Sequence, residues 1–235
     1  MNEILFFIIV FLANIIEAIT GFAGTMLAMP ISMRLIGADE AKVILNVIAI
    51  ILATGTTIRY HKHINVKEFV KILIFMIIGM AVGVYLYSTL DINFLLKIYG
   101  VIILLVAING LWGKQIRHLS PIAGVIILIA AGVIHGMFLS GGALLVIYAI
   151  STLKNKAVIR STLAPTWIVL NCILLTQDIM RGAFTPTTIS MTLVSLVPLF
   201  VAFIIGGILH KKMNQDFFVK LTYSLLIISS ITLFF

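Results

Sequence analysis

Apolar residues occur in eight long runs that short polar stretches separate. The runs cover residues 3–36, 43–58, 69–88, 94–112, 120–152, 160–177, 187–209 and 217–235. Apolar runs of about 20 residues are typical of helices that cross a bilayer. Strands of a membrane barrel would instead alternate apolar and polar residues, and the runs do not alternate in this way. The pattern therefore predicts an all-α polytopic membrane protein.

Two of these runs, 3–36 and 120–152, are too long for a single crossing. A straight helix of roughly 33 residues would be about 50 Å long, against about 30 Å of hydrocarbon. Glycine interrupts each run near its middle, in GFAGTMLAMP from Gly21 and in HGMFLSGGALL from His135. Because glycine is unfavourable inside a helix and allows the chain to turn, we expect each run to form two helices that fold back as a hairpin.

Composition agrees with a membrane protein, and the basic residues indicate its topology. The chain is 62% hydrophobic and 10% charged, which is more apolar than a soluble domain. If both long runs are hairpins, 12 of the 16 Lys and Arg lie on one side, and the other four are Arg34, Lys42, Lys97 and Arg181. Single crossings would divide the basic residues seven to nine. Cytoplasmic loops are enriched in Lys and Arg, so the charges favour the hairpins and place the linker 113–119 in the cytoplasm. We therefore expect a protein of the cell membrane (plasma or inner membrane) with both termini on its outer side.

The two halves of the chain show the same order of features, which predicts an internal repeat. Residues 1–112 contain the first hairpin followed by three crossings, and residues 120–235 contain the second hairpin followed by three crossings. A hairpin returns to its own side, so each half crosses the membrane an odd number of times and the halves insert in opposite orientations. Inverted repeats with broken helices are typical of secondary transporters.

The helix breaks indicate a binding site for a small anion. A helix that ends inside the membrane leaves backbone groups unpaired, and the N-terminus of the next helix has a partial positive charge. An anion can bind there without a buried basic side chain, and by this interpretation no Lys or Arg lies deep inside any run. The expected substrate-binding residues are Gly21, Gly24, Thr25, Asn46, Gly136, Ser140, Gly141, Gly142 and Thr162. The alternative is that the glycines only allow close packing of helices.

Two ionisable residues near the breaks are candidates for proton coupling. Glu17 is either a proton-coupling carboxylate or a protonated or hydrogen-bonded glutamate, for which Asn14, one turn earlier, is a candidate partner. His135 either relays a proton and binds the anion when charged, or packs as a hydrogen-bonded neutral side chain. Because Cys172 is the single cysteine, a disulfide within the chain and a cysteine-based metal site are excluded. We expect no metal or other cofactor, and no nucleic-acid partner, since the net charge of +8 comes from residues between the apolar runs.

The two glycine clusters and the residues around them resemble the TauE/SafE family of sulfite exporters, the TSUP permeases. The resemblance covers essentially the whole chain, and its motif residues are Gly21, Phe22, Gly24, Pro30, Gly136, Ser140, Gly141 and Gly142. Ile147 and Tyr148 stand where the family often has a proline, and Ala23 and Thr25 stand where it often has more glycine. The resemblance implies a transporter of a small anion, such as sulfite or an organosulfonate. We expect alternating access coupled to protons.

Two other functions remain open at this point. An anion channel would give flux that is neither saturable nor coupled. A hydrolase of the rhomboid type would use Ser140 as its nucleophile and His135 or His210 as its base, but Phe138 stands where such enzymes need glycine, and no second catalytic motif is present. We therefore expect a transporter and not an enzyme, with the small anion, protons and the lipid bilayer as its partners.

Overall fold

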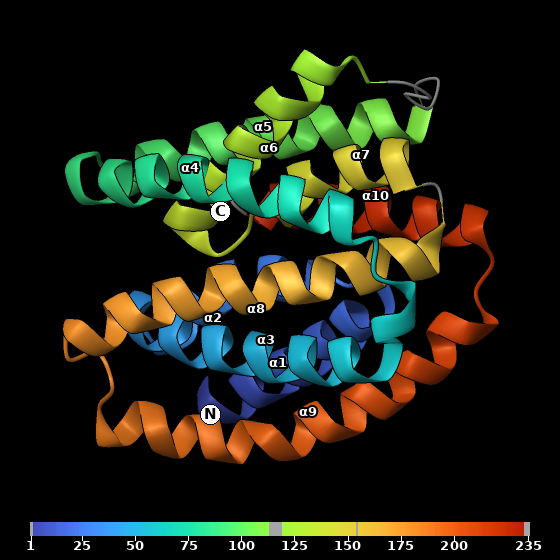
Figure 1. Cartoon of the computed structure of the whole chain (residues 1–235). Coiled ribbons are helices and arrows are strands. Elements are labelled where there is room, and N and C mark those ends of the chain that lie inside the picture. Colours follow the sequence, from blue (N-terminus) through green and yellow to red (C-terminus); the bar gives the residue numbers. More distant parts are fainter. Residues whose placement is uncertain (1, 113–118, 154, 233–235) are drawn as a thin grey trace.

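The computed structural model describes residues 2–112, 119–153 and 155–232. Within these residues every regular element is helical (Figure 1). The elements are α1 (Asn2–Thr20), α2 (Ala23–Ile36), α3 (Ala38–Tyr60), the 3-10 helix η1 (His61–His63), α4 (Val66–Thr89), α5 (Ile92–Trp112), α6 (Pro121–Phe138), α7 (Gly142–Leu153), α8 (Lys156–Met180), α9 (Pro186–Lys212) and α10 (Gln215–Thr232). Most of the expected linker 113–119, and Lys154, lie outside the described residues.

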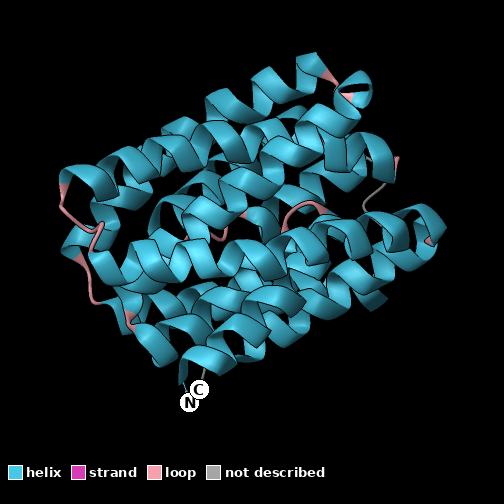
Figure 2. Cartoon of the chain, turned by 90° about the horizontal axis from the view of Figure 1, so that it is seen from below, coloured by secondary structure: helices cyan, strands magenta, loops and turns pink. Residues whose placement is uncertain are grey.

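Six of these helices are long and apolar enough to cross a membrane: α1, α3, α4, α6, α8 and α9. The long helices lie approximately along one direction, and a view turned by 90° shows the same bundle (Figures 1 and 2). The described part of the chain is therefore an all-α polytopic membrane protein, which confirms the fold class that the hydropathy pattern predicts.

Polar residues cap several helices, and α8 begins well before its apolar run. The run 160–177 lies inside α8, which starts after Asn155, and the side-chain oxygen of Asn155 accepts hydrogen bonds from two amides of the first turn. Ser120 caps α6 and Thr185 caps α9 in the same manner. A cap satisfies amides that the first turn of a helix leaves unpaired. As a consequence Arg160, at the edge of its apolar run, lies one turn inside α8.

Both long runs are interrupted at their glycine clusters. The helices α1 and α2 are separated by Gly21, which has a φ of +87°, and by Phe22. The helices α6 and α7 are separated by residues 139–141. α1 packs against α2, and α6 packs against α7. Each long run is thus a pair of packed helices joined by a short turn.

The two pairs of helices open toward opposite ends of the bundle. We name these ends the Lys156 end, where α8 begins, and the Arg181 end, where α8 finishes. The first pair leads into α3 at the Arg181 end, where Lys42 Nζ lies 3.6 Å from Asp178 Oδ1. In the second pair, Tyr148 of α7 donates a hydrogen bond of 2.5 Å to Glu68, which lies in the first turn of α4 at the Lys156 end.

The turns of the two pairs meet inside the bundle. A Cβ atom built on Gly142 would lie 2.9 Å from the ring of Phe22 and 3.0 Å from its carbonyl oxygen. The first turn of α7 is therefore in direct contact with the turn between α1 and α2, as two breaks around one site require.

Contacts between helices follow a two-fold pattern. α3 packs against α8, and α5 packs against α10. The contact of α1 with α9 corresponds to the contact of α6 with α4. α3 and α8 run antiparallel, since Lys42 contacts Asp178 at one end and Tyr60 contacts Arg160 at the other. Exchange of the first five α-helices with the last five would reproduce these contacts, which is the pattern expected of an internal repeat.

Glycines allow α4 and α6 to pack closely. A Cβ atom on Gly79 or Gly83 would overlap the backbone of α6, and one on Gly132 or Gly136 would overlap the backbone of α4. Small residues at such positions let two membrane helices approach until their backbones touch. Gly136 therefore has a packing role in this structure, in contact with α4 and not with the turn after α6.

Candidate functional site

Glu17 lies beside the first break and its carboxylate binds the N-terminus of α2. The side chain is buried, and its Oε2 accepts hydrogen bonds from the amide of Thr25 at 2.8 Å and from the Thr25 hydroxyl at 3.3 Å. The carboxylate therefore occupies the place where the sequence predicts that Thr25 contacts the substrate. Glu17 is thus hydrogen-bonded, but its partner is Thr25 and not the candidate Asn14, which donates to the carbonyl of Val10.

The glycines of the first break let neighbouring groups approach the backbone. A Cβ atom on Gly24 would lie 2.5 Å from the carbonyl of Ala13 and 2.5 Å from Glu17. Trp167 Nε1 donates a hydrogen bond of 2.6 Å to the carbonyl of Gly21. Gly24 is thus a packing position, whereas Gly21 connects the break to α8.

The second break is built like the first. A Cβ atom on Gly141 would overlap the carbonyl of Ala131 and the Cβ of His135, just as one on Gly24 would overlap Ala13 and Glu17. Glu17 and His135 thus take equivalent places, each four residues after the alanine that packs against the glycine. The hydroxyl of Ser140 donates to the carbonyl of Phe138 at 2.8 Å.

His135 lies between the two breaks with unpaired polar atoms around it. It is 1% exposed, and neither ring nitrogen has a hydrogen-bond partner within the described residues. Its ring lies 5.2 Å from that of Trp167, between centroids, and the side chain of Asn171 interacts with it without forming a hydrogen bond of normal geometry. Asn46 donates to the Asn171 carbonyl at 3.3 Å, while the Oδ1 atoms of both asparagines have no partner within the same described residues. We name these four residues the central cluster. Because buried polar atoms are nearly always bonded, the unpaired ones indicate a place that a ligand or water completes.

Thr162 does not join the central cluster. Its hydroxyl accepts a hydrogen bond of 3.0 Å from the amide of Asn65, which precedes α4 at the Lys156 end. Thr162 therefore fixes the connection between η1 and α4. Of the expected site residues, Asn46 and His135 belong to the central cluster, and Gly21 contacts it through Trp167. Gly142 packs on Phe22, and Gly24, Gly136 and Gly141 have close packing contacts.

Arg160 is a buried arginine where the sequence predicts none. It is 1% exposed, and none of its three guanidinium nitrogens has a hydrogen-bond partner among the described residues. The guanidinium carbon lies 4.7 Å from the centroid of the Tyr60 ring. Arg160 only opens its apolar run and does not lie deep inside it, but it is buried all the same, because α8 begins four residues before the run.

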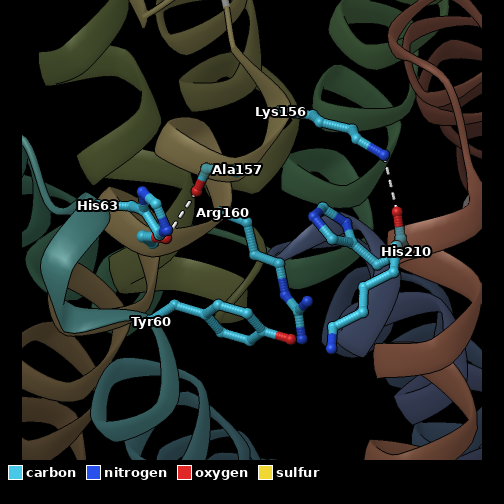
Figure 3. A pocket seen from close by; sticks show the side chains of 8 residues that line it. Tyr60, His63, Lys156, Ala157, Arg160 and His210 are labelled. Atoms are coloured by element: carbon cyan, nitrogen blue, oxygen red, sulfur yellow. Dashed lines mark hydrogen bonds between the residues drawn. The ribbon is translucent and has the colours of Figure 1, made fainter.

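Arg160 lines a pocket of about 210 Å³ at the Lys156 end. Figure 3 shows its guanidinium between the Tyr60 hydroxyl and His210. The described residues that line this Arg160 pocket include five basic ones and no acidic one; the basic ones are His63, Lys156, Arg160, His210 and Lys211. Lys156 Nζ donates to the carbonyl of His210 at 2.7 Å.

Four of the buried residues of α8 that carry polar groups lie on a single face. Arg160, Trp167, Asn171 and Asp178 are separated by seven, four and seven residues, spacings that place them on one side of a helix, and all four are buried. They extend over about 27 Å, close to the thickness of about 30 Å of a bilayer core. Pro165 lies inside the helix, between Arg160 and Trp167. The spacing is present in the sequence, and it is the signal that would have placed Arg160 on the buried face of a helix.

A serine–histidine pair of the hydrolase type is not formed. Ser140 donates to a backbone carbonyl, and the ring nitrogens of His135 have no hydrogen bond within the described residues. His210 Nδ1 donates to the carbonyl of Ile19 at 2.8 Å, and its ring lines the Arg160 pocket. Neither histidine therefore activates Ser140 in this structure.

The family profile described as "Sulfite exporter TauE/SafE" matches residues 6–233, which is nearly the whole chain. No curated protein and no solved structure gives a significant match.

Proposed function

The chain belongs to the sulfite exporter TauE/SafE family, and on this premise we propose that it is a secondary transporter of a small sulfur oxyanion or organosulfonate in the cell membrane. Membership itself implies a membrane transporter of sulfite or related anions. The choice of substrate, alternating access and coupling to protons are our proposal.

The observation that best supports this function is the meeting of two helix breaks at a buried cluster with unpaired polar atoms. Phe22 and Gly142 bring the breaks together, and His135, Asn46 and Asn171 have polar atoms without partners in the described part of the chain. A histidine N–H donates to an anion, and the asparagine Oδ1 atoms accept from an O–H. An oxyanion that retains one proton, such as hydrogen sulfite, offers both kinds of group. We propose that it binds at the central cluster.

Glu17 and His135 are the proposed proton-coupling groups. Glu17 binds the Thr25 amide with its carboxylate, so protonation of Glu17 would weaken the bond that closes the N-terminus of α2. That N-terminus would then be available to an anion. Proton uptake at Glu17 and anion binding at Thr25 would in this way be linked, while His135 at the equivalent place has both ring nitrogens available within the described residues.

The proposed architecture is an inverted repeat with the Lys156 end in the cytoplasm. Three features support the repeat: the two-fold pattern of helix contacts, the antiparallel arrangement of α3 and α8, and the opening of the two helix pairs at opposite ends. The basic lining of the Arg160 pocket supports the orientation, since Lys and Arg are enriched on the cytoplasmic side.

Efflux from proteoliposomes that contain labelled sulfite tests the proposed function. We expect saturable flux that depends on the pH difference across the membrane. His135→Gln and Asn46→Leu should each lower kcat/KM about tenfold or more, because a hydrogen bond to a charged ligand contributes about 1.5–3 kcal/mol. His61→Gln is the control, because His61 is exposed on η1 and its substitution removes the same type of side chain.

Two outcomes would contradict the proposal. Flux that rises linearly with sulfite concentration and ignores the pH difference indicates a channel. Unchanged flux in both His135→Gln and Asn46→Leu excludes the central cluster as the binding site. Gly141→Leu is a poor test, because any side chain at Gly141 overlaps the carbonyl of Ala131 and would disturb folding.

A further inference from the structure

We infer that the Arg160 pocket is a second anion site, which binds one oxyanion group of the substrate at the Lys156 end before the substrate reaches the central cluster. The inference rests on the proposed function for the identity of the anion. It rests on Arg160 and its surroundings for the site itself.

The first argument is the unpaired charge of Arg160. A buried guanidinium that makes no hydrogen bond is strongly unfavourable, because burial removes the water that would otherwise solvate it. Arg160 is 1% exposed, and its Nε, Nη1 and Nη2 have no partner among the described residues. An oxyanion satisfies such a group best, since two of its oxygens accept two parallel hydrogen bonds from the planar guanidinium.

A structural role does not account for these donors. The Tyr60 ring contacts the guanidinium at 4.7 Å, and a cation–π contact stabilises the charge but accepts none of its N–H groups. The Tyr60 hydroxyl also interacts with the guanidinium, but no hydrogen bond of normal geometry joins them, and one hydroxyl could in any case serve only part of the donors. Two backbone carbonyls beside the first break already have donors, because Ile19 O accepts from His210 and Gly21 O accepts from Trp167. The hydroxyl of Tyr60 has no partner within the described residues either, so it can donate to an anion that the guanidinium holds.

Charge and size define the class of ligand. The described lining has five basic residues and no carboxylate, so the pocket favours anions and rejects cations. Its volume of about 210 Å³ lies below the range of about 300–1,000 Å³ that is typical of drug-sized ligands. The pocket therefore fits a small sulfonate, sulfite or phosphate group, with room for a short organic chain.

Arg160 is also connected to the central cluster. A Cβ atom on Gly21 would lie 3.2 Å from Arg160 Cγ, so the arginine packs directly on the first break. The carbonyl of the same Gly21 binds Trp167, whose ring contacts His135. The turn around Gly21 therefore separates an anion at Arg160 from the central cluster.

Anion binding to the purified protein in neutral-lipid nanodiscs tests the site, with sulfite, taurine and inorganic phosphate as probes and thermal stability as the readout. We expect each anion that binds to raise the melting temperature of the wild type. Arg160→Lys keeps the charge and loses the bidentate geometry, so it should weaken binding about tenfold or more. Tyr60→Phe removes only a hydroxyl and should weaken binding less. Arg59→Gln is the matched control, because Arg59 is an exposed arginine next to Tyr60.

Each result decides for or against the inference. Wild-type affinity in both Arg160→Lys and Tyr60→Phe, which should fold normally, overturns it. An Arg160-dependent stabilisation by nanodiscs of phosphatidylglycerol, with none by the soluble anions, also overturns it, since the pocket then binds a lipid phosphate. The proposed function is tested separately by flux: wild-type efflux with an unchanged KM in Arg160→Lys overturns the second site alone. Absence of wild-type efflux overturns the proposed function, and anion binding at Arg160 would still be measured.

Discussion

At the scale of single residues, Gly21 is subject to two constraints at once. Its φ of +87° is unfavourable for residues with a side chain, and Arg160 Cα lies 3.3 Å from the position that a Cβ would take. The same glycine separates α1 from α2 and presents its carbonyl to Trp167. Backbone conformation, packing of Arg160 and the break in the helix therefore depend on one position.

We predict that Gly21→Ala lowers the free energy of unfolding by about 2 kcal/mol or more, from left-handed backbone strain and from contact with Arg160. Two other glycines separate these causes. Gly182 has a φ of +70° and no atom within 4 Å of a built Cβ, so Gly182→Ala measures strain alone, at about 1 kcal/mol. Gly207 has neither constraint, and Gly207→Ala should be neutral or stabilising. Thermal unfolding in detergent gives the order, and equal stability of all three variants would contradict the assignment.

The sequence predicts which residues surround the breaks better than it predicts what each does. A Cβ atom at Gly24 or Gly141 would overlap the carbonyl of Ala13 or Ala131, so close packing already requires glycine there, and contact with a ligand stays a prediction. Glu17 occupies the N-terminus of α2, because its carboxylate reaches the amide of Thr25 once the hairpin forms. A contact of this kind depends on how two helices pack against each other, which the hydropathy pattern does not predict.

At the scale of elements, the interface between α4 and α6 shows how small residues set the distance between helices. A Cβ atom on Gly79 would overlap the carbonyl of Ile129, which is backbone and cannot rotate away. A glycine on α3, Gly55, has only the ring of Phe203 near it, at an ordinary 3.4 Å. The two glycines therefore differ in what a methyl group would meet.

We predict that Gly79→Ala destabilises the protein by about 2 kcal/mol or more, since α4 must move away from α6 to admit the methyl group. Gly55→Ala should be neutral or stabilise by up to about 1 kcal/mol, since alanine favours a helix. Denaturation in mild detergent compares the two variants. A Gly79→Ala protein as stable as Gly55→Ala would show that α4 and α6 are farther apart than in this structure.

Hydropathy predicts where helices lie but not where they end. The helix that contains residues 160–177 is longer than its apolar run, because Asn155 caps it before the run begins. That difference of one turn is why hydropathy places Arg160 at the boundary of a loop, whereas the structure buries it. Capping residues such as Asn155 are readable from sequence, and they extend a helix beyond its apolar part.

At the scale of the whole molecule, the Arg160 pocket with its basic lining and the opening of the second hairpin lie at the Lys156 end. The opposite end contains the ion pair of Lys42 and Asp178, and Glu3 near the N-terminus lies against Pro186 at the start of α9. The chain therefore has two chemically different ends, as a protein that faces two compartments requires.

We predict that a membrane-impermeant maleimide labels Arg181→Cys in intact cells, and labels Lys62→Cys only after the cells are permeabilised. Both residues are exposed, and they lie at opposite ends of the bundle. The background is Cys172→Ser, which removes the single cysteine. Labelling of Lys62→Cys in intact cells would reverse the proposed orientation, and labelling of both would exclude opposite exposure of the two ends.

Pro165 has a mechanical consequence for α8. Proline has no amide hydrogen, so the carbonyl of Ser161, which lines the Arg160 pocket, lacks its usual partner within the helix. Helices bend most readily at such a residue. Pro165 would therefore let the first turns of α8, with Arg160, tilt relative to the rest of the helix. We expect such tilting to open or close access to the central cluster, so that the gate at the Lys156 end would be a few residues of one helix.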